Sequence, residues 1–100
     1  MGKTTLSGEE QTLFESTEMG EYTGHIFFDK LEAGDAVELY VYIRDEEDGQ
    51  YKLWNKWTLT APLDYPVMTL PYVVAKCGIR VTARQTAGTY KEVTHMWFRR

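Results

Sequence analysis

Residues 36–44 have the sequence Ala36-Val37-Glu38-Leu39-Tyr40-Val41-Tyr42-Ile43-Arg44. Aliphatic side chains occupy every second position of this stretch, and charged or tyrosine side chains lie between them. Successive side chains of a β-strand point to opposite faces of its sheet, so this alternation predicts a strand with one buried face. Tyr40 and Tyr42 then point outward. No stretch of the chain shows a convincing helical period of 3.6 residues.

The segments that follow predict two β-hairpins. Residues 45–49 are four acids and a glycine, which is typical of a turn, and residues 50–60 return with aromatic side chains and threonine. A hairpin is therefore expected over residues 36–60. Near the end of the chain, residues 78–85 alternate again and residues 89–98 return after a short glycine-containing turn. These residues predict the second hairpin.

The rest of the chain adds shorter strands. Residues 12–16 and 22–29 predict two strands that are separated by a turn. Three prolines confine residues 61–72 to a loop with a short edge segment near residues 68–70, because proline cannot donate a hydrogen bond to a central strand. Residues 72–76 are compatible with one helical turn.

About six to eight short strands without a useful helix predict an all-β fold, a two-sheet antiparallel β-sandwich. We favour a jelly-roll-like topology over an immunoglobulin-like one, because the latter places a tryptophan between two cysteines and this chain has only Cys77. One hundred residues suit a single domain, residues 1–100. Its first ten residues are acidic and contain glycine, so residues 1–10 are expected to form a flexible N-terminal arm.

Charge is distributed unevenly along the chain. Residues 1–50 carry thirteen acids and three bases, whereas residues 51–100 carry two acids and eight bases. One interpretation is that acidic and basic strands become neighbours and pair across the sheets. The other is a molecule with oppositely charged surfaces that associates head to tail with copies of itself. An isoelectric point near 5.1 argues against nucleic-acid binding.

The residue types that carry chemistry are few and scattered. The two histidines, His25 and His95, have no ligand or nucleophile spacing that would join them to Cys77, so we expect no catalytic residue and no metal site. Glu38 is the best single candidate for carboxylate chemistry, but it lacks a partner. Residues 45–49 lack the ligand pattern of a calcium loop, and position 56 is lysine where that loop requires glutamate. The glycines never reach phosphate-loop spacing, and we expect no cofactor.

Aromatic residues are the unusual feature, at 14% of the chain. Trp54 and Trp57 have opposite parity along their strand, so one of them should point outward with the tyrosines. Trp97 should likewise point away from its neighbours Met96 and Phe98. Either residues 61–76 cover this aromatic surface, or a partner subunit does, or it is a platform on which sugar rings stack. The candidate interface residues are the aromatic side chains Tyr40, Tyr42, Trp54, Trp57 and Trp97, with Arg80, Arg84, Arg99 and Arg100 as the basic side of the contact.

The two hairpins carry a resemblance. The stretches Leu31–Glu38, Tyr40–Arg44, Asp48–Lys52 and Gly78–Thr89 resemble small β-sandwich structural proteins of virions, in tailed phages and related viruses, with head-decoration, capsid-stabilising or fibre-like roles. The resemblance implies a non-enzymatic assembly protein that binds protein, as a homo-oligomer or on a major capsid protein. It also implies a virion component that is assembled in the host cytoplasm.

The last expectations concern membranes and the alternative function. The chain shows no signal peptide and no apolar stretch of the ~18–20 residues that a transmembrane helix needs, so we expect no membrane partner. The alternative function is a carbohydrate-binding or adhesion module that uses the outward tyrosines and tryptophans.

Overall fold

The structure is a computed structural model that describes residues 2–47 and 49–100. The described residues form nine β-strands and no helix. The strands are β1 (Gly2–Thr5), β2 (Gln11–Ser16), β3 (Gly20–Phe27), β4 (Ala36–Ile43), β5 (Lys52–Thr60), β6 (Val67–Thr69), β7 (Val73–Ala75), β8 (Ile79–Ala87) and β9 (Glu92–Arg99).

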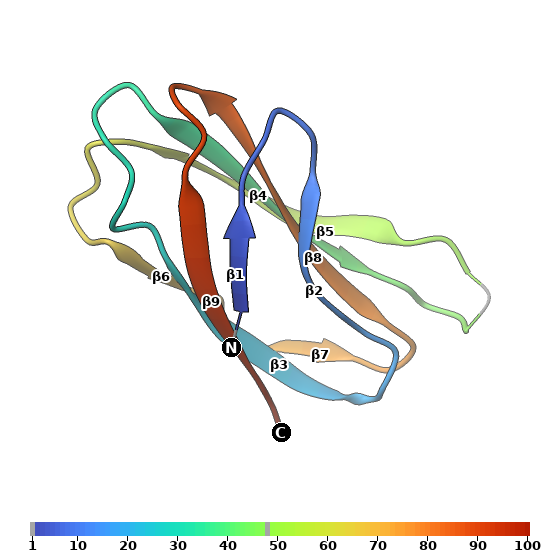
Figure 1. Cartoon of the computed structure of the whole chain (residues 1–100). Helices are drawn as coiled ribbons and strands as arrows, with labels where there is room; N and C mark the ends of the chain where they lie inside the picture. The colour runs from blue at the N-terminus through green and yellow to red at the C-terminus, as the bar shows by residue number, and fades with distance from the viewer. Residues whose placement is uncertain (1, 48) are drawn as a thin grey trace.

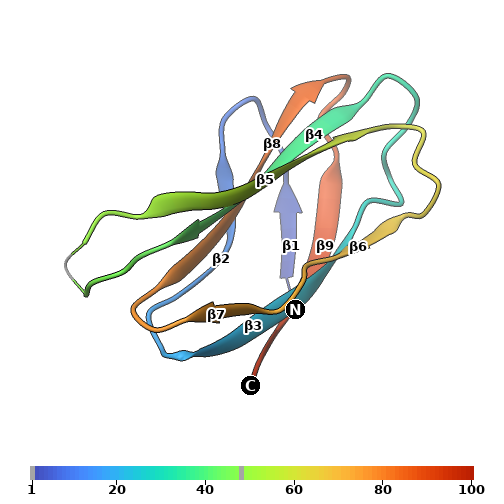
Figure 2. The same cartoon turned by 180° about the vertical axis from the view of Figure 1, so that it is seen from behind.

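The strands form two sheets that pack face to face (Figure 1). Sheet A has the order β1-β9-β3-β6, and β7 pairs with another part of β3. Sheet B has the order β2-β8-β4-β5. Every pairing is antiparallel. Strands β4 and β5 of sheet B lie nearest the viewer in the reverse view of Figure 2. The expected all-β two-sheet sandwich is therefore confirmed.

The pairings follow one long hairpin of chain that is rolled into two sheets. β4 pairs with β5, β3 with β6 and β7, β2 with β8, and β1 with β9. The strands of the first half thus alternate with those of the second half in both sheets, which is jelly-roll topology. Nine strands appear where about six to eight were expected, because β1 and β7 are strands that the sequence analysis did not predict.

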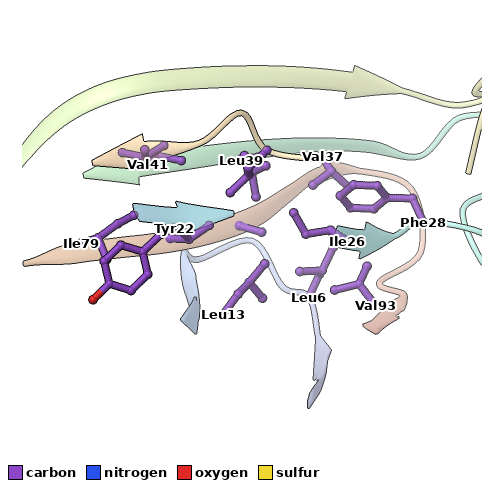
Figure 3. Packing of buried hydrophobic residues seen from close by; sticks show 14 of the residues in the cluster. Leu6, Leu13, Tyr22, Ile26, Phe28, Val37, Leu39, Val41, Ile79 and Val93 are labelled. Atoms are coloured by element: carbon purple, nitrogen blue, oxygen red, sulfur yellow. The ribbon is translucent and has the colours of Figure 1, made fainter. Parts of the chain in front are cut away.

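The core lies between the sheets and is built by the alternation that the sequence shows. Val37, Leu39 and Val41 of β4 are completely buried. Ile26 and Val93 of sheet A are also buried and belong to the same cluster, in which labelled side chains of the two sheets point toward one another (Figure 3). Burial of each such side chain stabilises the fold by roughly 1.5–3 kcal/mol.

The N-terminal residues differ from the expected flexible arm. Gly2–Thr5 form β1, which pairs with β9, and Leu6 is buried in the core. The backbone N–H of Leu6 donates to the carbonyl of Lys91, and the carbonyl of Ser7 accepts from Gln85. The polar composition of this segment suggested that it would be flexible. Instead, the buried Leu6 and these backbone hydrogen bonds fix it to the sandwich.

The proline-rich region agrees with the sequence in one part and differs in another. The expected edge segment is β6, which ends sheet A. The possible helical turn at residues 72–76 is wrong, because Val73–Ala75 form β7. Val73 and Ala75 are buried and Val74 is exposed, which is the alternation of a strand.

Candidate functional site

The outer face of sheet B is centred on a carboxylate that has three donors. Glu38 accepts from the ammonium of Lys56 at 2.7 Å and from the hydroxyl of Tyr40 at 2.8 Å. Its third partner is the guanidinium of Arg84, which the register places directly opposite on β8. The hydrogen bond from Lys56, with those from Arg84 and Tyr40, lowers the pKa of Glu38 to about 2. This carboxylate stays ionised at neutral pH, unlike a general acid.

Tyr42 continues this face beside Tyr40. The two rings are stacked, with centroids 6.2 Å apart and an angle of 16° between their planes. The Tyr42 hydroxyl donates to Glu10 at 2.6 Å, and the Thr82 hydroxyl donates to the same oxygen at 2.6 Å. Burial, with the hydrogen bond to Glu10, raises the pKa of Tyr42 to about 12. Both tyrosines point outward as expected, but their rings and hydroxyls already have partners.

Tyr51 lies beside a polar hollow on the same face. The guanidinium of Arg80 lies 4.3 Å from the centre of the Tyr51 ring and that of Arg44 lies 5.2 Å from it. Arg80 also pairs with Glu15 at 3.1 Å. The hollow has a volume of about 590 Å³, and its lining includes Tyr42, Tyr51 and several charged or hydroxyl side chains.

The four arginines that were proposed for an intermolecular contact form ion pairs inside the chain. Their partners are Glu15 for Arg80, Glu38 for Arg84, Glu18 for Arg99 and Glu21 for Arg100. Within the described part of the chain, each of the nine ion pairs joins a residue of 1–50 to a residue of 51–100. Acidic and basic strands therefore pair across the sheets, which was the first interpretation of the uneven charge.

Trp97 was expected to be an outward interface residue, and this expectation is wrong because its side chain packs in the interior. Its ring stacks on Phe14 with centroids 5.1 Å apart, and it packs against the core cluster. The indole N–H donates to Nδ1 of His95 at 2.8 Å.

The parity argument for Trp54 and Trp57 fails because β5 contains a bulge. Asn55 lies opposite Val41 and Leu53 lies opposite Tyr42, so Trp54 is the extra residue. The two indole rings consequently lie 6.2 Å apart instead of on opposite faces. Trp57 packs against the core, and Trp54 stays 45% exposed at the edge.

The outer face of sheet A has a different character. The register places His25 opposite Met96, Phe27 opposite Thr94, and Thr23 opposite Phe98. Val67 of β6 continues this surface beside Phe27. Phe98 is 50% exposed and Val67 is 41% exposed. We call this set of residues, Thr23, His25, Phe27, Val67, Thr94, Met96 and Phe98, the sheet A face.

Two hollows lie on the sheet A face. One has a volume of about 650 Å³ and includes Thr23, His25 and Phe98 in its lining, together with the exposed ring of Tyr72. The other has a volume of about 500 Å³ and includes Phe27, Thr94 and Met96. The sequence prediction noted Met96 and Phe98 but missed His25 and Phe27. Their signal was the alternation of residues 22–29, in which His25 and Phe27 share a side opposite to the core residues.

The histidines and the cysteine do not form a site. His25 lies on the outer side of sheet A, where Nδ1 contacts the Thr69 hydroxyl at 2.7 Å. His95 is buried on the inner side and contacts the Thr4 hydroxyl at 3.0 Å. Cys77 is a free thiol that contacts the carbonyl of Asp45. Within residues 2–47 and 49–100, no group of three histidine, cysteine, aspartate or glutamate side chains could hold a metal ion.

The acidic turn between β4 and β5 is partly described. Asp45 pairs with Lys52 at 3.0 Å, and this hydrogen bond lowers the pKa of Asp45. Asp48 lies outside the described residues.

Among the residues that the structure describes, no helix has the length and apolar character needed to cross a bilayer.

Comparison of the chain with protein-family models, with curated proteins and with solved structures finds no match.

Proposed function

We propose that this chain is a non-enzymatic structural protein that works in a larger assembly by burying the sheet A face against another protein molecule. The observation that carries the proposal is the contrast between the two outer faces. The sheet B face consists mostly of carboxylates, bases and tyrosines that bind one another around Glu38 and Glu10, and its exposed Leu53 lies on the edge strand β5. The sheet A face instead presents Phe98 and Val67 to solvent.

An exposed apolar centre of this kind is characteristic of interaction sites. Protein interfaces place apolar and aromatic side chains at the centre and polar groups at the rim. On the sheet A face, Phe27, Met96 and Phe98 form such a centre. The ion pairs of Lys30 with Glu92 and of Arg100 with Glu21 lie at its two ends. This surface replaces the aromatic residues of sheet B as the proposed contact.

A virion is the assembly that we propose, in a decoration or fibre-type role. The resemblance of the hairpin stretches to small virion proteins supports this role. Jelly-roll sandwiches also occur in viral capsid domains, although they occur in lectins and cupins as well. The fold supports this role by analogy, and the contact surface follows from the residues of the sheet A face.

The test is site-specific photocrosslinking in the cells in which the chain naturally functions. A photoreactive benzoyl-phenylalanine replaces Phe98 in one variant and Tyr90 in the control. Tyr90 is similarly exposed, at 55%, and it lies in the connection between β8 and β9. We expect covalent adducts with protein from position 98 and few from position 90. Equal yields from the two positions, or no adduct from position 98, would contradict the proposal.

A carbohydrate-binding module is the second candidate, and the polar hollow beside Tyr42 and Tyr51 favours it. Tyr42 lines this hollow while its ring stacks on Tyr40, and hydroxyl and charged groups surround it. Binding sites for small ligands combine such rings with a few polar groups. Selective binding on a glycan array that is lost in Tyr42→Ala would support this candidate, and a uniform background signal would exclude it.

A further inference from the structure

We propose that the occupant of the sheet A face is a second copy of this chain, packed face to face across a two-fold axis. This inference rests on the proposed function and names its partner. Three features of the face support it, namely the charges at its ends, the sizes of its side chains and its area.

The charges at the ends of the face alternate in sign. At one end, Glu21 of β3 lies beside Arg100, and their side chains pair at 3.0 Å. At the other end, Lys30 follows β3 and pairs at 3.0 Å with Glu92, the first residue of β9. Acid and base thus exchange places between β3 and β9 from one end to the other.

This pattern is complementary to itself. These four side chains stay 37–74% exposed within their own ion pairs, so a second copy can share them. A second copy rotated by 180° about an axis in the plane of the face places Arg100 opposite either Glu92 or Glu21 of the partner subunit. The first arrangement has the axis across the strands, and the second has it along them. Lys30 meets an acid in both arrangements. Other charges on or beside this surface are Lys3, Asp29 and Arg99, and Arg99 pairs with Glu18 of its own chain.

The side chains at the centre are complementary in size. Phe98 lies opposite Thr23 in the register, and Phe27 lies opposite Thr94. Both rotations place each phenylalanine over a threonine of the second copy, because the large and small residues are arranged symmetrically about the row of His25 and Met96. Each hollow of the face has one of these threonines in its lining. Large side chains that meet small ones allow close packing.

The size of the face sets the expected strength. In sheet A, only β3 and β9 are eight residues long, and β1, β6 and β7 have three or four residues each. With a rise of about 3.3 Å and a strand spacing of about 4.8 Å, the strands of sheet A cover roughly 400 Å². Standard interfaces bury about 800 Å² on each partner. The dimer should therefore be weak in isolation, because the face is smaller than a standard interface. Repetition within an assembly would strengthen it.

The experiment is sedimentation analysis of the purified chain over a range of concentrations. The wild-type mass should rise toward twice the chain mass of 11.6 kDa. Phe98→Asp places a charge in the apolar centre and should weaken dimerisation at least about tenfold. Tyr90→Asp, at an equally exposed ring outside the face, should change it less than about threefold. Circular dichroism checks that each variant is folded.

A second variant tests the charge pattern. Arg100→Glu is a surface change, and it places an acid opposite Glu92 or Glu21 of the second copy in either arrangement. We expect weaker dimerisation, most clearly at low salt. A wild-type chain that stays monomeric at about 500 μM, or equal effects of Phe98→Asp and Tyr90→Asp, would overturn the second copy as partner. The proposed function would survive that result if position 98 still forms adducts with other proteins, and would fall if it forms none.

Discussion

His95 is a buried base whose neutral form is selected by its neighbours. The indole N–H of Trp97 can only donate, so Nδ1 of His95 accepts this hydrogen bond and carries no proton. Nε2 therefore holds the proton and donates to the Thr4 hydroxyl. Protonation of Nδ1 would direct two N–H groups at each other inside the sandwich. Burial also lowers the pKa of His95 below its usual value of 6.5.

We therefore expect the free energy of unfolding to fall as the pH falls from about 7.5 to about 5.5. The unfolded chain takes up the proton at its ordinary pKa of about 6.5, whereas folded His95 resists it. The stabilisation is complete above that pKa and is lost as the pH falls from there through the lower folded pKa. Urea unfolding at a series of pH values measures this loss, and His25→Gln should retain it. A flat profile over this range would contradict the role of His95.

Two glycines with positive φ provide a matched pair. Gly34 has φ of 97° and open space where a Cβ would lie. Gly88 has φ of 85°, but a Cβ there would overlap the carboxylate of Asp35. That buried carboxylate accepts from the backbone N–H of Thr89 at 3.1 Å and from Lys91 at 3.0 Å. It thereby ties the β8–β9 turn to the loop before β4.

Gly34→Ala should cost about 1–2 kcal/mol of stability from backbone strain alone. Gly88→Ala should cost about 2 kcal/mol more, because it must displace Asp35 and leave buried groups without hydrogen bonds. Chemical denaturation of the two variants beside the wild type measures the difference. Equal losses would show that Asp35 moves aside without consequence, contrary to this account.

At the scale of elements, β5 is an open edge strand with its own protection. Ala61 donates to the carbonyl of Asp35, and bonded pairs alternate along antiparallel strands, so the N–H of Lys56 faces away from β4. The side chain of Asn55 accepts this N–H at 2.8 Å. Two lysines and the bulge at Trp54 add further protection. Such features keep exposed edges from pairing with other chains.

Asn55→Val should make the chain aggregate faster on mild heating, since it removes the acceptor from the edge N–H and adds a β-branched apolar side chain. Thr58→Val is the control, because it adds similar apolar surface on the same strand and leaves Asn55 in place. Light scattering over time measures the rates. Equal rates for the two variants would contradict a protective role of Asn55.

The sequence pattern predicted some features of these strands correctly and others wrongly. Alternation predicted the buried and outer faces of β4 and β8 because these strands pair in register along most of their length. It failed at Trp54, because the β-bulge there shifts the side-chain alternation by one residue and the sequence pattern does not reveal a bulge. It could identify Tyr40 and Tyr42 as outward, but it could not show that Lys56 lies over the Tyr40 ring or that Glu10 accepts from Tyr42. These two partners come from distant parts of the chain, and only the fold brings them there.

At the scale of the whole molecule, the uneven charge follows from the topology. A chain that folds as one long hairpin about the β4–β5 turn places its acidic first half against its basic second half. The ion pairs on the surface are individually weak, with a typical contribution of about 0–1 kcal/mol. They nevertheless engage Arg80 and Arg84 on the outer face of sheet B, whereas Arg100 lies at one end of the sheet A face. The sheet A face, whose centre is apolar, is left as the surface for association.

The most direct test of this account is to dilute the purified chain while recording its backbone amide spectrum by nuclear magnetic resonance. We expect signals of β3, β6 and β9 to shift with concentration, with the largest shifts near His25, Met96 and Phe98. Signals near Tyr40, Tyr42 and Tyr51 should stay constant. Shifts that concentrate on sheet B, or a spectrum that does not change up to about 500 μM, would contradict association through the sheet A face.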